Sequence, residues 1–71
     1  MAEAEAMTGE LGREEVELLG LLARGMPLGA VARRLATSER TVRRRVRTIC
    51  GRLGVGTPIE AVVWAAQRRL V

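Results

Sequence analysis

The chain has 71 residues, with 12 arginines, 8 glutamates and a net charge of +4. A chain of this length forms one small domain, which buries only about 60% of the surface of its unfolded state and is marginally stable. It contains no His, Asp, Phe or Tyr. We therefore expect no Ser-His-Asp triad, no metal, no cofactor, no catalytic site and no enzymatic activity. A single Trp is the one aromatic residue, and this scarcity disfavours an all-β fold.

The charge is unevenly distributed along the chain. Residues 1–17 contain six Glu and one Arg, a net charge of −5, whereas residues 18–71 contain eleven Arg and two Glu, a net charge of +9. A GC-rich genome explains why the basic residues are Arg rather than Lys, but it does not explain their positions. This basic region predicts a polyanionic partner, with DNA, RNA and an anionic membrane surface as the candidates.

Residues 1–10 are acidic and end near Gly9, and we expect them to form a flexible leader before a single domain at 11–71. They resemble no secretory signal, because they lack a basic start and an apolar segment. No apolar run approaches the roughly 20 residues that a membrane span needs. We therefore expect a cytoplasmic, nucleoid-associated protein without membrane contact.

The first predicted helix spans 13–24 and stops at Gly25. Leu11, Leu18 and Leu22 share one face of this helix with Glu15, and Leu21 lies beside them. Gly12 cannot cap this helix with a side chain, so we expect its start to fray. Val16 and Met26 are expected to be exposed.

The second predicted helix is short, about eight residues. It starts at Met26-Pro27, with proline in its first turn, where the missing N–H has no partner to lose. Val31, Ala32 and Leu35 lie on its apolar side, and it ends at Ala36-Thr37.

The third predicted helix spans 39–53, after Ser38 as its N-cap. Its apolar stripe comprises Val42, Val46, Ile49 and Leu53, with Cys50 beside it as a small core residue. The arginines lie on the remaining surface. Those directly opposite the stripe are Arg40, Arg44 and Arg47, with Arg43 and Thr48 on the two flanks and Arg45 nearer the apolar edge.

The fourth predicted helix opens with Thr57-Pro58-Ile59-Glu60, in which Thr57 caps, Pro58 takes the first position and Glu60 closes a capping box. Ala61, Val62 and Ala65 share its core face. Val63, Trp64 and Ala66 lie off this face, and we expect them to form a second apolar surface. Trp64 is therefore either a partly buried core residue or an anchor at a dimer contact.

The second and third helices are joined by a short link at 36–38, and the second of the pair is basic on its outer face. This is the arrangement of a helix-turn-helix, whose second helix fits the DNA major groove. A solvated helix face offers a simpler explanation for exposed arginines. Six Arg opposed by only Glu39 favour a polyanion, because a solvated face normally mixes charges to limit repulsion.

Six segments follow one another with a characteristic order and spacing: LGREEVELL at 11–19, LLARG at 21–25, VARRL at 31–35, SERTVR at 38–43, LGV at 53–55 and EAV at 60–62. Together they resemble the LuxR/GerE-type DNA-binding domain, which also ends response regulators of the NarL type. The resemblance implies an all-α, four-helix helix-turn-helix bundle. It also implies that the helix at 39–53 enters the major groove of double-stranded DNA and that the last helix makes a homodimer.

The resemblance assigns base reading to Arg43, Arg44 and Arg47. It implies contacts to the DNA backbone from Ser38, Thr41, Arg40, Arg45, Thr48 and Arg52, and a dimer interface at Val63, Trp64 and Gln67. Pro27 to Ala30 and Pro58 depart from the usual residues of the family. The preferred DNA sequence of its relatives therefore cannot be transferred.

Other functions with this layout stay open. A protein-interaction module of the same fold would contact RNA polymerase, as region 4 of sigma factors does, although the LGV segment argues against it. Membrane-surface binding is disfavoured because the stripe of the 39–53 helix is narrow. The expected function is sequence-specific DNA binding in bacterial transcription regulation.

Overall fold

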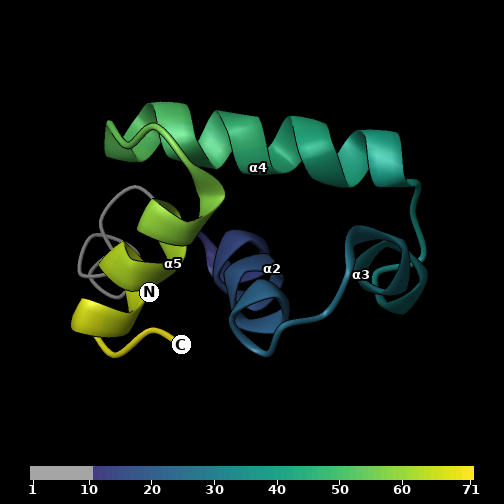
Figure 1. Cartoon of the computed structure of the whole chain (residues 1–71), viewed down its shortest axis with the longest axis horizontal. Helices are drawn as coiled ribbons and strands as arrows, with labels where there is room; N and C mark the ends of the chain where they lie inside the picture. Colours follow the sequence, from purple (N-terminus) through teal and green to yellow (C-terminus); the bar gives the residue numbers. More distant parts are fainter. Residues whose placement is uncertain (1–10) are drawn as a thin grey trace.

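The computed structural model describes residues 11–71, which form four α-helices and no strand (Figure 1). The helices are α2 (Arg13–Ala23), α3 (Leu28–Arg34), α4 (Glu39–Leu53) and α5 (Pro58–Gln67). The predicted all-α helix-turn-helix bundle is thereby confirmed. The leader expected at 1–10 lies outside the described residues.

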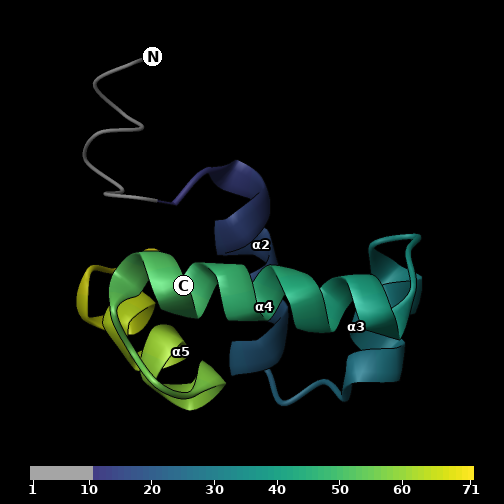
Figure 2. The ribbon, with the colours of Figure 1, turned by 90° about the horizontal axis from the view of Figure 1, so that it is seen from above.

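Helix α4 runs along one long edge of the molecule, with α2, α3 and α5 all on its other side (Figure 1). It packs against α3 and α5, while α2 packs against α5 and α3. In the view onto α4, no other described helix lies in front of it (Figure 2). One side of α4 therefore belongs to the core and the other faces solvent along its whole length.

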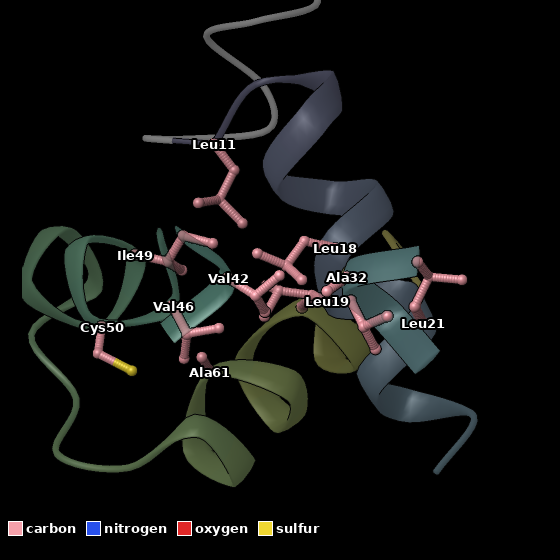
Figure 3. Packing of buried hydrophobic residues seen from close by; sticks show 12 residues of the cluster. Leu11, Leu18, Leu19, Leu21, Ala32, Val42, Val46, Ile49, Cys50 and Ala61 are labelled. Carbon is pink, nitrogen blue, oxygen red and sulfur yellow. The ribbon is translucent and has the colours of Figure 1, made fainter. Parts of the chain in front are cut away.

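The core is aliphatic and draws on all four helices. Its fully buried large side chains are Leu11, Leu18, Leu19, Val31, Val42 and Ile49. Leu11 points inward toward Ile49 and Leu18, and Val42 meets the α2 side chains (Figure 3). The predicted stripe of α4 and the core position of Cys50 are confirmed.

The exposure expected for Val16 and Met26 was wrong, because both are partly buried and pack against this core. Helix α2 also buries Leu19, which the predicted stripe omitted. A bundle of short helices covers α2 from more than one side. The buried surface of α2 is therefore wider than one stripe at helical spacing indicates.

The predicted caps of the two later helices are confirmed. The Ser38 hydroxyl accepts a hydrogen bond from the N–H of Thr41 at 3.1 Å, and the Thr57 hydroxyl accepts one from Glu60 at 3.3 Å. Pro58 is the first residue of α5, as expected. The Glu60 carboxylate accepts hydrogen bonds from the N–H of Gly56 and the hydroxyl of Thr57, which completes the cap.

The start and end of α3 differ from the prediction. Pro27 precedes the helix in an extended conformation instead of lying in its first turn, and its carbonyl accepts from Val31 at 3.0 Å. The helix ends at Arg34 because Ala36 takes a left-handed conformation, with φ of 57°. The helix-turn-helix link therefore begins earlier than its composition indicated.

All four described helices end in the same way. A left-handed residue follows the helix, and the next N–H donates back to a carbonyl five residues earlier, as Thr37 does to Ala32 at 2.8 Å. Glycine takes the left-handed position after α2 and α4, where its lack of Cβ removes the strain. The four left-handed residues are Gly25, Ala36, Gly54 and Arg69.

Replacing each of two glycines near the end of α4 by alanine tests where this helix ends. Gly54 has φ of 71°, so Gly54→Ala should lower the free energy of unfolding by about 1 kcal/mol. Gly51 lies within the helix, and a methyl group at this position would meet no atom within 4 Å, so Gly51→Ala should raise the free energy of unfolding by about 0.5–1 kcal/mol. Urea unfolding measures both, and shifts of the same sign would contradict the assigned end of α4.

Candidate nucleic-acid interface

The solvent side of α4 is a continuous basic surface. Every arginine of this helix is exposed, while Val42, Val46 and Ile49 are buried on the other side. At about 100° per residue, Arg40, Arg44 and Arg47 lie opposite the buried stripe. We call the exposed arginines of α4 the basic face, comprising Arg40, Arg43, Arg44, Arg45, Arg47 and Arg52.

Two arginines of the basic face are held by carboxylates. Nη2 of Arg43 lies 3.5 Å from Oε1 of Glu39, one turn earlier in α4. Nη1 of Arg52 lies 3.6 Å from Oε2 of Glu15, which belongs to α2. Among residues 11–71, the other four arginines of the face form no ion pair.

The two ion pairs lie on the flanks of the basic face and leave its centre without a carboxylate partner among residues 11–71. Arg43 and Arg52 lie on opposite flanks of α4, where Glu39 of the same helix and Glu15 of α2 come within reach. The centre of the face, around Arg44, stays positively charged. Sequence reasoning placed all six arginines on α4 but could not find the contact with Glu15, because 37 positions separate it from Arg52.

The hydroxyl groups predicted to contact DNA already have partners within the protein. The Ser38 hydroxyl donates to Oγ1 of Thr41 at 3.1 Å in addition to accepting its N–H. The Thr48 hydroxyl donates to the carbonyl of Arg44 at 3.0 Å. Ser38 and Thr48 are nonetheless exposed, and each oxygen can accept a further hydrogen bond. To donate to a phosphate, either hydroxyl must first turn away from its partner within the protein.

A hollow of about 510 Å³ adjoins one flank of the basic face. Its lining is mainly apolar, with two guanidinium groups at α4, and comprises Leu22, Leu28, Arg43, Val46, Arg47, Cys50, Gly56 and Pro58. Burial raises the pKa of the Cys50 thiol, and the nearby Glu60 carboxylate raises it further. The thiol therefore stays protonated at neutral pH, as suits a core side chain and not a nucleophile.

A second surface lies on α5, where the dimer contact was predicted. Val63, Trp64 and Gln67 line one open hollow of about 270 Å³. Val63 is 46% exposed and Trp64 is half-buried, so Trp64 both packs against the core and reaches this surface. The guanidinium of Arg68 stacks on the Trp64 ring, 3.9 Å from its centroid.

Sequence reasoning missed two apolar members of this α5 surface. Ile59 is 67% exposed, and Val55 lines the same hollow from the turn before α5. Ile59 stood in the Thr-Pro-Ile-Glu segment, which was interpreted only as a helix start. Its spacing of four from Val63 would have placed the two on one face.

Residues 11–71 contain no cluster of acidic, Cys or His side chains that could hold a metal ion. In the same region, no helix is both long and apolar enough to cross a bilayer.

The chain is similar to known regulatory proteins. The family model described as "Bacterial regulatory proteins, luxR family" matches residues 10–65, which include α2, α3, α4 and most of α5. The "Nitrate/nitrite response regulator protein NarL" of Escherichia coli (strain K12) is 33% identical over 69 residues, 97% of this chain and 32% of the relative.

Two further relatives are also named as regulatory proteins. The "Bialaphos biosynthetic pathway regulatory protein" of Streptomyces hygroscopicus is 40% identical over 62 residues, 87% of this chain and 24% of its own length. "Transcriptional regulatory protein YdfI" of Bacillus subtilis (strain 168) is 37% identical over 62 residues, 87% of this chain and 29% of its own length. The chain thus spans about a third or less of these relatives, and no solved structure matches it.

Proposed function

The chain belongs to the LuxR family of bacterial regulatory proteins, and on this premise we propose that it binds double-stranded DNA sequence-specifically in transcription regulation. The observation that carries the proposal is the basic face of α4, which no other described helix covers (Figure 2). An α-helix with its side chains is about 10–12 Å wide and fits a major groove about 12 Å wide. Helix α4 is the recognition helix.

Base reading falls to Arg43, Arg44 and Arg47. A guanidinium can bond O6 and N7 of one guanine together, which a point charge cannot. Arg44 and Arg47 lie on the side of α4 away from the core, which supports this role. Arg43 lies on a flank, where Glu39 limits the directions that its guanidinium can take.

Phosphate and sugar contacts come from the ends and flanks of the same helix. Helix α4 begins at an exposed N-terminus, where free N–H groups attract a phosphate. The side chains assigned to the DNA backbone are exposed, apart from Thr41, whose exposure is intermediate, and this exposure supports their role. The backbone-contacting residues are Ser38, Arg40, Thr41, Arg45, Thr48 and Arg52.

Two chains assemble as a homodimer through the α5 surface. Exposed Ile59 and Val63 lie one turn apart beside Trp64, and such a contiguous apolar surface is typical of a protein contact. A two-fold dimer would present two α4 helices to two half-sites of DNA. The alternative function is that of a protein-interaction module with the same fold, whose partner would be RNA polymerase.

DNA binding should weaken steeply with salt. Three backbone arginines per chain, or about six per dimer, predict a slope of roughly −5 in a plot of log affinity against log salt. Fluorescence anisotropy with labelled duplexes selected from a random pool measures it between about 50 and 200 mM salt, over which affinity should fall about 10³-fold. A flat dependence would overturn DNA binding, and capture of RNA polymerase without DNA affinity would favour the alternative.

Removing a base-reading arginine should blur sequence preference. Arg44→Ala should cost about 1–3 kcal/mol on the selected site and little on random DNA. Arg24→Ala is the matched control, because it removes the same charge from an exposed residue at the end of α2. Equal losses for both variants, or equal losses on both DNAs, would remove Arg44 from base reading.

A charge on the α5 surface should break the dimer. Val63→Glu would bury a carboxylate in the contact and should cost about 2 kcal/mol or more, roughly a 30-fold rise in the dimer dissociation constant. Ala23→Glu, at an exposed position outside this surface, is the control. Sedimentation equilibrium measures both, and unchanged dimerisation of Val63→Glu would place the interface elsewhere.

A further inference from the structure

Glu15 uses its two carboxylate oxygens for two different tasks. Oε1 accepts a hydrogen bond from the N–H of Gly12 at 3.0 Å, which caps the start of α2. Oε2 lies 3.6 Å from Nη1 of Arg52 in the last turn of α4. One side chain therefore connects the first turn of one helix to the last turn of another.

The cap fixes where this carboxylate points. Gly12 has no side chain to accept the N–H groups in the first turn of α2. Glu15 instead accepts the N–H of Gly12 itself, which opposes the expected fraying of the helix start. A Cβ at position 12 would lie 2.9 Å from Oε1, so glycine leaves room for the carboxylate to approach. Arg52 thus meets a carboxylate that a backbone hydrogen bond holds in place.

The pair is partly shielded from water. The Glu15 side chain is 29% exposed and that of Arg52 is 48% exposed. A half-buried carboxylate interacts with a guanidinium more strongly than a fully solvated one, because less water screens the charges. Arg52 keeps enough exposure on the flank of α4 to be reached by a phosphate.

We propose that Glu15 is a positioning residue for DNA binding, which holds the Arg52 guanidinium on the flank of α4 in an orientation that meets the DNA backbone. The inference rests on the proposed DNA-binding function. A long arginine side chain loses rotamer freedom when it binds, and a partner that restrains it beforehand reduces that loss. The planar guanidinium has five N–H donors, so it can contact a carboxylate and a phosphate at once.

The chain supplies a matched control for this role. Glu14 is the preceding residue, is exposed in the same first turn, and has no hydrogen bond or ion pair within residues 11–71. Glu14→Gln and Glu15→Gln change the net charge equally, at adjacent positions of the same helix turn. Gln at position 15 keeps an oxygen for the Gly12 N–H, so the cap survives while the ion pair is lost.

The test compares both variants with and without Arg52→Ala, on the selected DNA site. Glu15→Gln should bind about 2- to 10-fold more weakly than Glu14→Gln. Its salt slope should be shallower by up to about 0.9 per chain, because a phosphate contact is lost. With Arg52→Ala present, the two glutamine variants should bind alike.

The salt slope separates positioning from stability. A loss of folded protein lowers affinity at every salt concentration without changing the slope, and urea unfolding monitors it directly. If Glu15→Gln does not fold, Arg52→Lys replaces it, since this variant keeps the charge but loses the planar guanidinium. It should then lose affinity by a similar factor, and unchanged binding would overturn the proposal.

The remaining outcomes are also decisive. Equal binding of the two glutamine variants, or tighter binding of Glu15→Gln, would overturn the positioning role and leave DNA binding intact. A difference that persists with Arg52→Ala would show that Glu15 does not act through Arg52. Failure of the wild-type chain to bind any duplex would overturn the proposed function itself.

Discussion

Val42, Val46 and Ile49 bury one side of α4 in the aliphatic core, and their contact orients the whole helix. Because a helix turns about 100° per residue, burying these positions directs Arg44 and its neighbours away from the protein. A domain this small can bury α4 on one side only. The same packing that stabilises the fold therefore presents the basic face, and a substitution that rotated α4 would alter both.

Concentrating arginines on one helix raises the free energy of the isolated domain through repulsion between like charges. The structure relieves this repulsion at the flanks, where Glu39 lies near Arg43 and Glu15 near Arg52. The centre of the face keeps its charge. Such a distribution confines the uncompensated positive charge to the surface that faces solvent, which suits a polyanion that lies along the helix.

The helix ends illustrate how far local sequence reasoning extends. Ser38 and Thr57 were identified as caps because each satisfies backbone N–H groups only two or three residues away, and the structure bears out both. The end of α3 was misplaced because Ala36 adopts a left-handed conformation that alanine disfavours when isolated. The hydrogen bonds that the N–H groups of Ala36 and Thr37 donate back into α3 offset this preference, and composition does not reveal them.

The amino-acid sequence was sufficient to establish the helical class, the buried stripe of α4, its arginine-rich outer side and the family resemblance, since all of these depend on periodicity and order along the chain. The folded structure was needed to show which carboxylates meet which arginines and which side chains share the α5 surface. Glu15 reaches Arg52, and Val55 joins Ile59 and Val63, through the way the helices and turns pack. Such contacts depend on the relative placement of the helices, which helical periodicity does not encode.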